Sequence, residues 1–188
     1  MVPREIVLVR HGRPDLKNVS PIAGTELAAF VRRYNESGIN RDQAPPDALR
    51  QMASASGCIL SSDLPRSSES AAWLSDLAQI EPDLHEAGLP DRIRNPIRLH
   101  PAVCVAMARA MWWLNCADSH ETILAARERA SRVADRLIVL AKEQKSVMVV
   151  GHGMFNRLVA KCLRERGWTG PRFLPRGYWS TARFVENR

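Results

Sequence analysis

The sequence lacks a long hydrophobic run. Its strongest apolar stretches, Ile6–Val9 and Val147–Val150, are each only four residues long, whereas a membrane-spanning helix needs about 20 apolar residues. The N-terminus enters the first stretch directly, with no signal-peptide h-region and no small-residue cleavage site. We therefore expect a cytoplasmic protein with no membrane partner.

The sequence also lacks the usual metal-binding spacings. Its four cysteines form no CxxC pair, and its five histidines show neither HxxxH nor HExxH spacing. No cluster of aspartates flanks the motifs described below. We therefore expect reduced thiols, no metal site and no cofactor.

Internal repeats, low-complexity segments and Gly/Ser linkers are absent, which favours a single domain over residues 1–188. The formal net charge is +7, yet no continuous Lys/Arg tract interleaved with aromatic residues supports a nucleic-acid partner. We predict no nucleic-acid partner. A nucleic-acid binder stays open as an alternative on net charge alone, and the sequence does not indicate an oligomeric state.

Strand-like and helix-like segments alternate along the chain. The expected strands are 5–10, 57–61 and 146–150, with shorter ones near 83–85 and 178–185. The expected helices are 25–37, 64–78 after an Asp63 N-cap, 102–114, Asp118 to about 143, and 155–166. Continuous rather than alternating apolar strands are typical of parallel sheets that are covered on both faces. The pattern predicts an α/β fold: a single-domain three-layer sandwich with a mostly parallel central sheet flanked by helices.

Two of the strongest predicted strands end in a glycine-flanked histidine, at His11 and at His152. In open α/β sheets, ligands bind beyond the carboxyl ends of the strands. A functional site is therefore expected where these two histidines meet.

Four short motifs carry a family resemblance. They are Arg10-His11-Gly12, the block 61–71 with Arg66 three residues after Asp63, the acidic segment 84–88, and Gly151-His152-Gly153. In the residues of these four motifs and in their order along the chain, the protein resembles the histidine phosphatase superfamily, in the phosphoglycerate mutase-like branch. The resemblance implies a phosphoglycerate mutase-like fold and a phosphohistidine intermediate.

The chemistry of these residues agrees with that resemblance. Catalysis of phosphoryl transfer depends on positioning the reacting groups and on neutralising the negative charge that is spread over the phosphoryl oxygens. Arg10 and Arg66 can grip phosphate oxygens through paired N–H donors, and protonated His152 adds another donor. Gly153 lets backbone N–H groups at a helix start approach the anion. His11 would attack phosphorus as a neutral imidazole.

Glu86 is the residue that the family pattern matches to the general acid. A carboxylic acid must protonate the leaving oxygen and later activate water. Glu81, Asp83 and Asp91 lie close enough in the sequence to compete for this role.

The first motif departs from the family pattern after Gly12. Arg13, Pro14 and Asp15 follow where many relatives have an acidic residue and then Thr. Asn18 lies one position later than the expected phosphate-contacting Asn. We keep Arg13 and Asn18 as candidate substrate-binding residues.

Arg92, Arg94 and Arg98 are further candidates, able to bind a second anionic group of the substrate. A basic loop that has no binding role accounts for these three arginines equally well. They lie in the segment 88–117, the one part of this short chain available as a small lid over the site.

A small lid favours hydrolysis, because a mutase must keep its phosphoenzyme away from water. We therefore expect a metal-independent phosphomonoester hydrolase. Its substrate would be a small phosphorylated metabolite or a phosphoprotein, phosphohistidine proteins included. Phosphoglycerate mutase-type transfer and a non-catalytic phosphate-binding module stay open.

Overall fold

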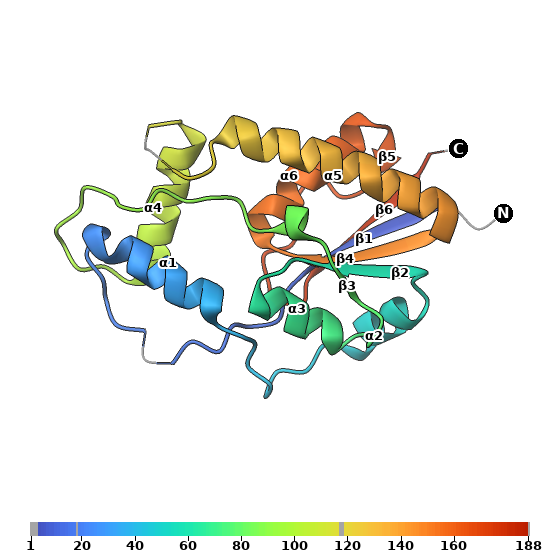
Figure 1. Ribbon diagram of the computed structural model, residues 1–188, viewed down its shortest axis with the longest axis horizontal. Helices are drawn as coiled ribbons and strands as arrows, with labels where there is room; N and C mark the ends of the chain where they lie inside the picture. Colours follow the sequence, from blue (N-terminus) through green and yellow to red (C-terminus); the bar gives the residue numbers. More distant parts are fainter. Residues whose placement is uncertain (1–3, 18, 117–118, 188) are drawn as a thin grey trace.

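The central sheet of the computed structural model, which describes residues 4–17, 19–116 and 119–187, has the strand order β3-β2-β4-β1-β6-β5. The strands are β1 (Glu5–Arg10), β2 (Cys58–Ser61), β3 (Gln79–Ile80), β4 (Ser146–Gly151), β5 (Trp168–Thr169) and β6 (Thr181–Glu186). Strands β1 to β4 are parallel, while β6 runs antiparallel to both β1 and β5. The predicted α/β fold with a mostly parallel sheet is confirmed (Figure 1).

Strands β1 and β4 lie side by side at the centre of the sheet. Their register pairs Glu5 with Ser146 and Arg10 with Gly151, so both strands end at the same level. Their apolar residues are buried because helices cover both faces of the sheet. The residues that follow the two strands, His11 and His152, therefore emerge at one edge.

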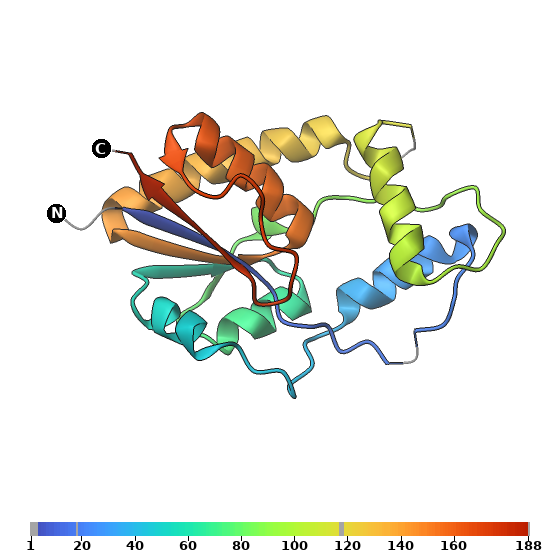
Figure 2. The ribbon, with the colours of Figure 1, turned by 180° about the vertical axis from the view of Figure 1, so that it is seen from behind.

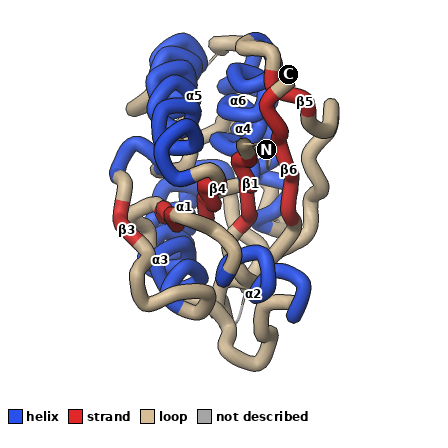
Figure 3. The backbone as a smooth tube through the Cα atoms, turned by 90° about the vertical axis from the view of Figure 1, so that its right-hand side faces the viewer, coloured by secondary structure: helices blue, strands red, loops and turns tan. Residues whose placement is uncertain are grey.

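Successive residues of β1 supply two separate hydrophobic cores. Ile6 and Leu8 pack in the core with α5 (Ile123–Gln144) and α6 (Gly153–Glu165). Val7 and Val9 pack on the opposite face with α2 (Asp47–Ser54) and α3 (Pro65–Ala72). Side chains of a strand alternate between faces, which produces the three layers. Figure 3 shows the strands between these two pairs of helices.

Two further helices, α1 (Leu27–Glu36) and α4 (Pro101–Trp113), lie beyond the carboxyl ends of the strands (Figures 1 and 2). A small third core joins them, built on Leu27, Ile93, Cys104 and Ala108. The short 3-10 helix η1 (Gly24–Glu26) precedes α1. Across the ranges that the structure describes, no helix has both the length and the apolar character needed to cross a membrane.

Local expectations around β3 were wrong. The segment expected as a strand at 83–85 overlaps the 3-10 helix η2 (Pro82–Leu84), whose first turn Glu81 caps by accepting from the Asp83 N–H. The strand is β3, a few residues earlier, and β5 was not predicted at all. Both are two-residue strands at the edges of the sheet, too short to show a clear period in the sequence.

Two predicted helix boundaries also differ. The helix expected over 64–78 is α3, which ends at Ala72, and Asp63 does not cap it. Instead, the Asp63 carboxylate accepts a hydrogen bond from His85 at 2.9 Å. The predicted cap Asp118 lies outside the described residues. The Thr122 hydroxyl caps α5 by accepting from the Ala125 N–H at 3.2 Å.

Replacing Thr122 by Ala should lower the free energy of unfolding by about 1 kcal/mol, since an N-cap acceptor for the longest helix is lost. Denaturant unfolding measures the change. Thr25→Ala, at an exposed threonine of η1, is the matched control and should shift the free energy by less than about 0.5 kcal/mol. Equal effects of the two substitutions would contradict the capping role.

Candidate active site

Three adjacent strands bring the motif residues together at one edge of the sheet. His11 follows β1, Arg66 lies in the first turn of α3 after β2, and His152 follows β4 as the N-cap residue of α6. The order β2-β4-β1 makes these strands neighbours. The His11 N–H also donates to the carbonyl oxygen of Gly151 at 3.0 Å, which joins the first and third motifs directly.

His11 is buried, and its hydrogen bonding selects one tautomer. Its Nδ1 lies 2.7 Å from the carbonyl oxygen of Gly12, which can only accept, so Nδ1 carries the proton. The other nitrogen, Nε2, then holds a lone pair. Burial, followed by the nearby His152 and Arg66, holds the pKa of His11 well below its usual 6.5. His11 is therefore neutral and can act as a nucleophile at neutral pH.

His152 lies against His11, with ring centroids 5.2 Å apart. Its Nε2 is 2.8 Å from the Ser62 hydroxyl, which also accepts from the Leu64 N–H at 3.1 Å. Burial, followed by the positive charge of Arg66, holds the pKa of His152 well below 6.5. When Ser62 donates to Nε2, the proton of the neutral ring lies on Nδ1.

Arg10 and Arg66 each lie over a tyrosine ring. The Arg66 guanidinium carbon is 4.4 Å from the ring centroid of Tyr34, and that of Arg10 is 4.7 Å from Tyr178. Arg66 Nη1 donates to the carbonyl oxygen of Tyr34 and to the Asn35 side chain, at 3.1 and 3.2 Å. Arg10 Nη1 donates to the carbonyl oxygen of Arg176. The two tyrosines and Asn35 were missed in the sequence because they lie outside the four motifs.

Three buried nitrogens of this site have no hydrogen-bond partner within the described part of the chain. They are Nε of Arg10, Nε of Arg66 and Nδ1 of His152. Buried donors are normally paired, and an unpaired cationic donor is expensive. All three nitrogens belong to side chains that act electrostatically on His11, a combination that suits an oxyanion.

The loop after β1 is held by two contacts. The Gly12 N–H donates to the Ser70 hydroxyl at 2.8 Å. A Cβ on Gly12 would lie 2.5 Å from the Trp179 ring, which explains the glycine. A Cβ on Gly153 would make only an ordinary contact with Arg10, so its role in phosphate binding stays a prediction.

Glu86 lies at the N-terminus of α6. Its carboxylate accepts from the N–H groups of Phe155 at 2.9 Å and Met154 at 3.4 Å, and from its neighbour Ala87 at 2.9 Å. An acidic group is favourable at a helix N-terminus. Because His152 is the N-cap residue of the same helix, Glu86 is placed close to the imidazole pair.

Arg129 of α5 holds the segment before Glu86. It donates to the carbonyl oxygens of Asp83 and His85 at 2.6 and 2.8 Å. It also forms a bidentate ion pair with Glu121, at 2.8 and 2.9 Å.

Arg109 of α4 holds the segment after Glu86. It donates to the carbonyl oxygens of Gly88 and Ala87 at 2.8 and 3.1 Å, while Glu121 accepts from the Gly88 N–H at 3.1 Å. The backbone on both sides of Glu86 is thus tied to two helices. No sequence motif signals these contacts.

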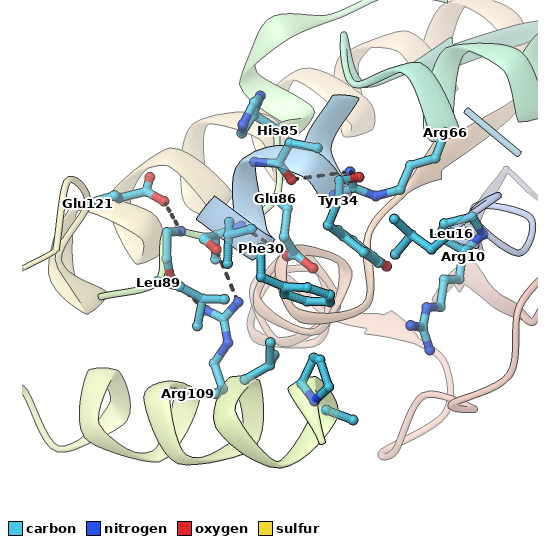
Figure 4. A pocket seen from close by; sticks show the side chains of 18 of the residues that line it. Arg10, Leu16, Phe30, Tyr34, Arg66, His85, Glu86, Leu89, Arg109 and Glu121 are labelled. Atoms are coloured by element: carbon cyan, nitrogen blue, oxygen red, sulfur yellow. Dashed lines mark hydrogen bonds between the residues drawn. The ribbon is translucent and has the colours of Figure 1, made fainter. Parts of the chain in front are cut away.

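The site opens into a cavity of about 1040 Å³. Figure 4 shows Arg10 and Arg66 at one end of it and Leu89 and Arg109 at the other. Of the predicted site residues, those that line the cavity are Arg10, Arg13, Arg66 and Glu86. His11 and His152 are buried beside this end, at 2% and 0% exposure. The competing acid Asp91 also lines the cavity, whereas Glu81 and Asp83 do not.

The three candidate arginines Arg92, Arg94 and Arg98 do not line the cavity. Arg92 and Arg94 are exposed, and Arg98 pairs with Glu26 at 2.9 Å and with the carbonyl oxygen of Pro21. Their part in substrate binding stays a prediction without geometric support. Asn18 lies outside the described residues.

The segment 88–117, predicted as a lid, contributes to the cavity wall through other residues, which are Gly88, Leu89, Asp91, His100, Pro101, Ala102, Val105 and Arg109.

Among the described residues, no three side chains of His, Cys, Asp or Glu gather closely enough to hold a metal ion.

Solved structures with the same fold include several phosphatases. Glucosyl-3-phosphoglycerate phosphatase Rv2419c, a mycobacterial protein, is 20% identical with a TM-score of 0.56, over 96% of this chain and 89% of that one. The ecdysone phosphate phosphatase of Bombyx mori, solved with tungstate, is 13% identical with a TM-score of 0.55, over 98% and 92%. Open reading frame Rv3214 of Mycobacterium tuberculosis is 16% identical with a TM-score of 0.58, over 96% and 90%.

These likenesses show the fold, and no curated protein matches the sequence. The family is shown by a sequence model that spans nearly the whole chain. The model of the histidine phosphatase superfamily, branch 1, matches residues 6–184, which include all four motifs. The chain therefore belongs to branch 1 of the histidine phosphatase superfamily.

Proposed function

We propose that the protein is a phosphomonoester hydrolase in which His11 forms a phosphohistidine. The observation that carries this proposal is the set of buried nitrogens of Arg10, Arg66 and His152 that have no hydrogen-bond partner in the described part of the chain, beside the neutral imidazole of His11. The neighbours named as phosphatases, one of them solved with tungstate, support an oxyanion ligand.

In the first step, Nε2 of His11 attacks phosphorus and the P–O bond to the leaving group breaks. The leaving oxygen takes a proton from the Glu86 carboxylic acid. In the second step, water attacks phosphorus while the Glu86 carboxylate takes its proton, and the N–P bond breaks to release phosphate. Support for the nucleophile comes from the Nδ1–H bond to Gly12, which directs the lone pair to Nε2.

Arg10, Arg66 and His152 would neutralise the charge on the phosphoryl oxygens, and the reaction is proposed to need no metal. An arriving phosphate should raise the pKa of His152, because an anion within a few ångströms favours the imidazolium. Gly153 and Arg13 remain proposed contacts for the phosphate and for the rest of the substrate. The segment 88–117 would cover the site.

Rapid quenching during turnover should trap a phosphoryl label that is labile to acid and stable to alkali. The label should vanish in His11→Ala. Chelators should leave the rate unchanged. A chelator-sensitive rate, or a label that persists in His11→Ala, would overturn the mechanism. No turnover of p-nitrophenyl phosphate would favour a binding module, and phosphoryl transfer faster than hydrolysis would favour a mutase.

Glu86→Gln should slow hydrolysis of alkyl phosphates by about 100-fold or more, the usual contribution of a general acid. The loss on p-nitrophenyl phosphate should be smaller, because its leaving group barely needs a proton. Glu81→Gln and Asp83→Asn are the comparison variants, since neither residue lines the cavity. Equal losses on both substrates would indicate that Glu86 only stabilises the start of α6.

Stability should fall as the pH drops below about 6.5. The pKa values of buried His11 and His152 lie below the value of an unfolded chain, so the unfolded state binds more protons in this window. Below pH 6.5, each histidine should contribute a slope of up to about 1.4 kcal/mol per pH unit. Its contribution to stability is present in full above 6.5 and is lost on acidification. Denaturant unfolding between pH 7 and 5.5 measures it.

His152→Gln should remove one histidine's share of this slope. His120→Gln, at an exposed side chain, should keep the slope unchanged. If the free energy of unfolding of the wild-type protein does not change between pH 6.5 and 5.5, both histidines are solvated in the native protein. The neutral nucleophile is then not supported.

A further inference from the structure

The cavity extends far beyond the phosphoryl end. Its volume of about 1040 Å³ is at the upper limit of sites for drug-sized ligands, roughly 300–1,000 Å³. The three motif side chains that would hold a phosphate meet at one end, under the ends of β1, β2 and β4. Most of the space is therefore left for the organic part of a substrate.

The wall of this remaining space is largely apolar. Phe30 and Val31 of α1 face it, together with Val105 of α4 and with Leu16 and Leu89 from the adjoining loops. Val31, Leu89 and Val105 also pack on the small third core, which supports this wall from behind. Figure 4 shows Phe30 and Leu16 between the arginine end and Leu89.

Of the charged groups that line the cavity, Arg109, Glu121 and Asp91 are already engaged by the protein, whereas Arg13 is exposed. Arg109 donates to backbone carbonyls at 2.8 and 3.1 Å, and Glu121 is paired with Arg129. Asp91 and His120 lie 3.2 Å from each other. A hydroxyl-rich or second anionic group would lose its water here and find these side chains occupied.

We infer that the substrate is a phosphomonoester with a bulky apolar organic group, which lies between α1 and α4 while its phosphate occupies the His11 end. This inference rests on the proposed function for the orientation of the ligand. It disfavours small sugar phosphates and phosphopeptides, whose polar bodies would gain nothing from this wall.

A series of ethyl, butyl and hexyl phosphate tests the inference. The ratio kcat/KM should rise by about two- to fourfold for each added methylene, since one buried CH₂ is worth up to about fourfold. Glycerol phosphate, glucose 6-phosphate and a phosphoserine peptide should fall below hexyl phosphate by at least about tenfold. A flat series, or a polar substrate that exceeds hexyl phosphate, overturns the inference.

Val105→Ser places a hydroxyl in the apolar wall and should lower the preference for hexyl over ethyl phosphate by about three- to tenfold. Val103→Ser is the matched control: it makes the same change on the same helix at a residue that is 46% exposed. The two variants should unfold at similar temperatures if both fold. Equal preferences in both variants overturn the placement of the organic group.

Binding to His11→Ala separates this inference from the proposed hydrolysis. Calorimetry should give a lower Kd for hexyl than for ethyl phosphate by at least about tenfold. If the wild-type protein hydrolyses no ester but this binding difference appears, the proposed reaction fails and the inference stands. If p-nitrophenyl phosphate is hydrolysed while Kd and kcat/KM stay flat across the series, the reaction stands and the inference fails.

Discussion

The buried guanidinium of Arg66, the half-buried one of Arg10 and two buried imidazoles lie together at one edge of the sheet, and the arrangement of the rest of the site depends on stabilising them. The partners of Arg10 and Arg66 are carbonyl oxygens, an amide oxygen and the faces of tyrosine rings. Such partners hold a cation in place without cancelling its charge. Burial first, and then neighbouring positive groups that include these arginines, lower the pKa values of His11 and His152.

The start of α6 links this charged cluster to the cavity. No side chain of the local sequence caps the helix, and Glu86 accepts from its first-turn N–H groups instead. Because Arg129 and Arg109 hold the backbone on either side of Glu86, this carboxylate connects α4, α5 and α6. Helix α4, which lines the far end of the cavity, is therefore linked through Arg109 to the backbone next to the proposed acid.

Much of the fold followed from local pattern. The continuous apolar runs of β1 and β4 predicted buried parallel strands, and strand ends followed by Gly-flanked histidines predicted where His11 and His152 would lie. Predictions failed where a residue had two local options. Asp63 is a plausible N-cap by type, yet its carboxylate pairs with His85.

The sequence by itself determined the family resemblance and the order of the four motifs along the chain. It also determined the four candidate groups Arg10, His11, Arg66 and His152. Those features are encoded in short motifs and in apolar runs, which are local. Only the tertiary structure decided that Tyr34 and Tyr178 support the arginines and that α1 and α4 enclose an apolar cavity. These contacts join segments far apart in the chain, and each residue type involved occurs equally well in a helix face or a core.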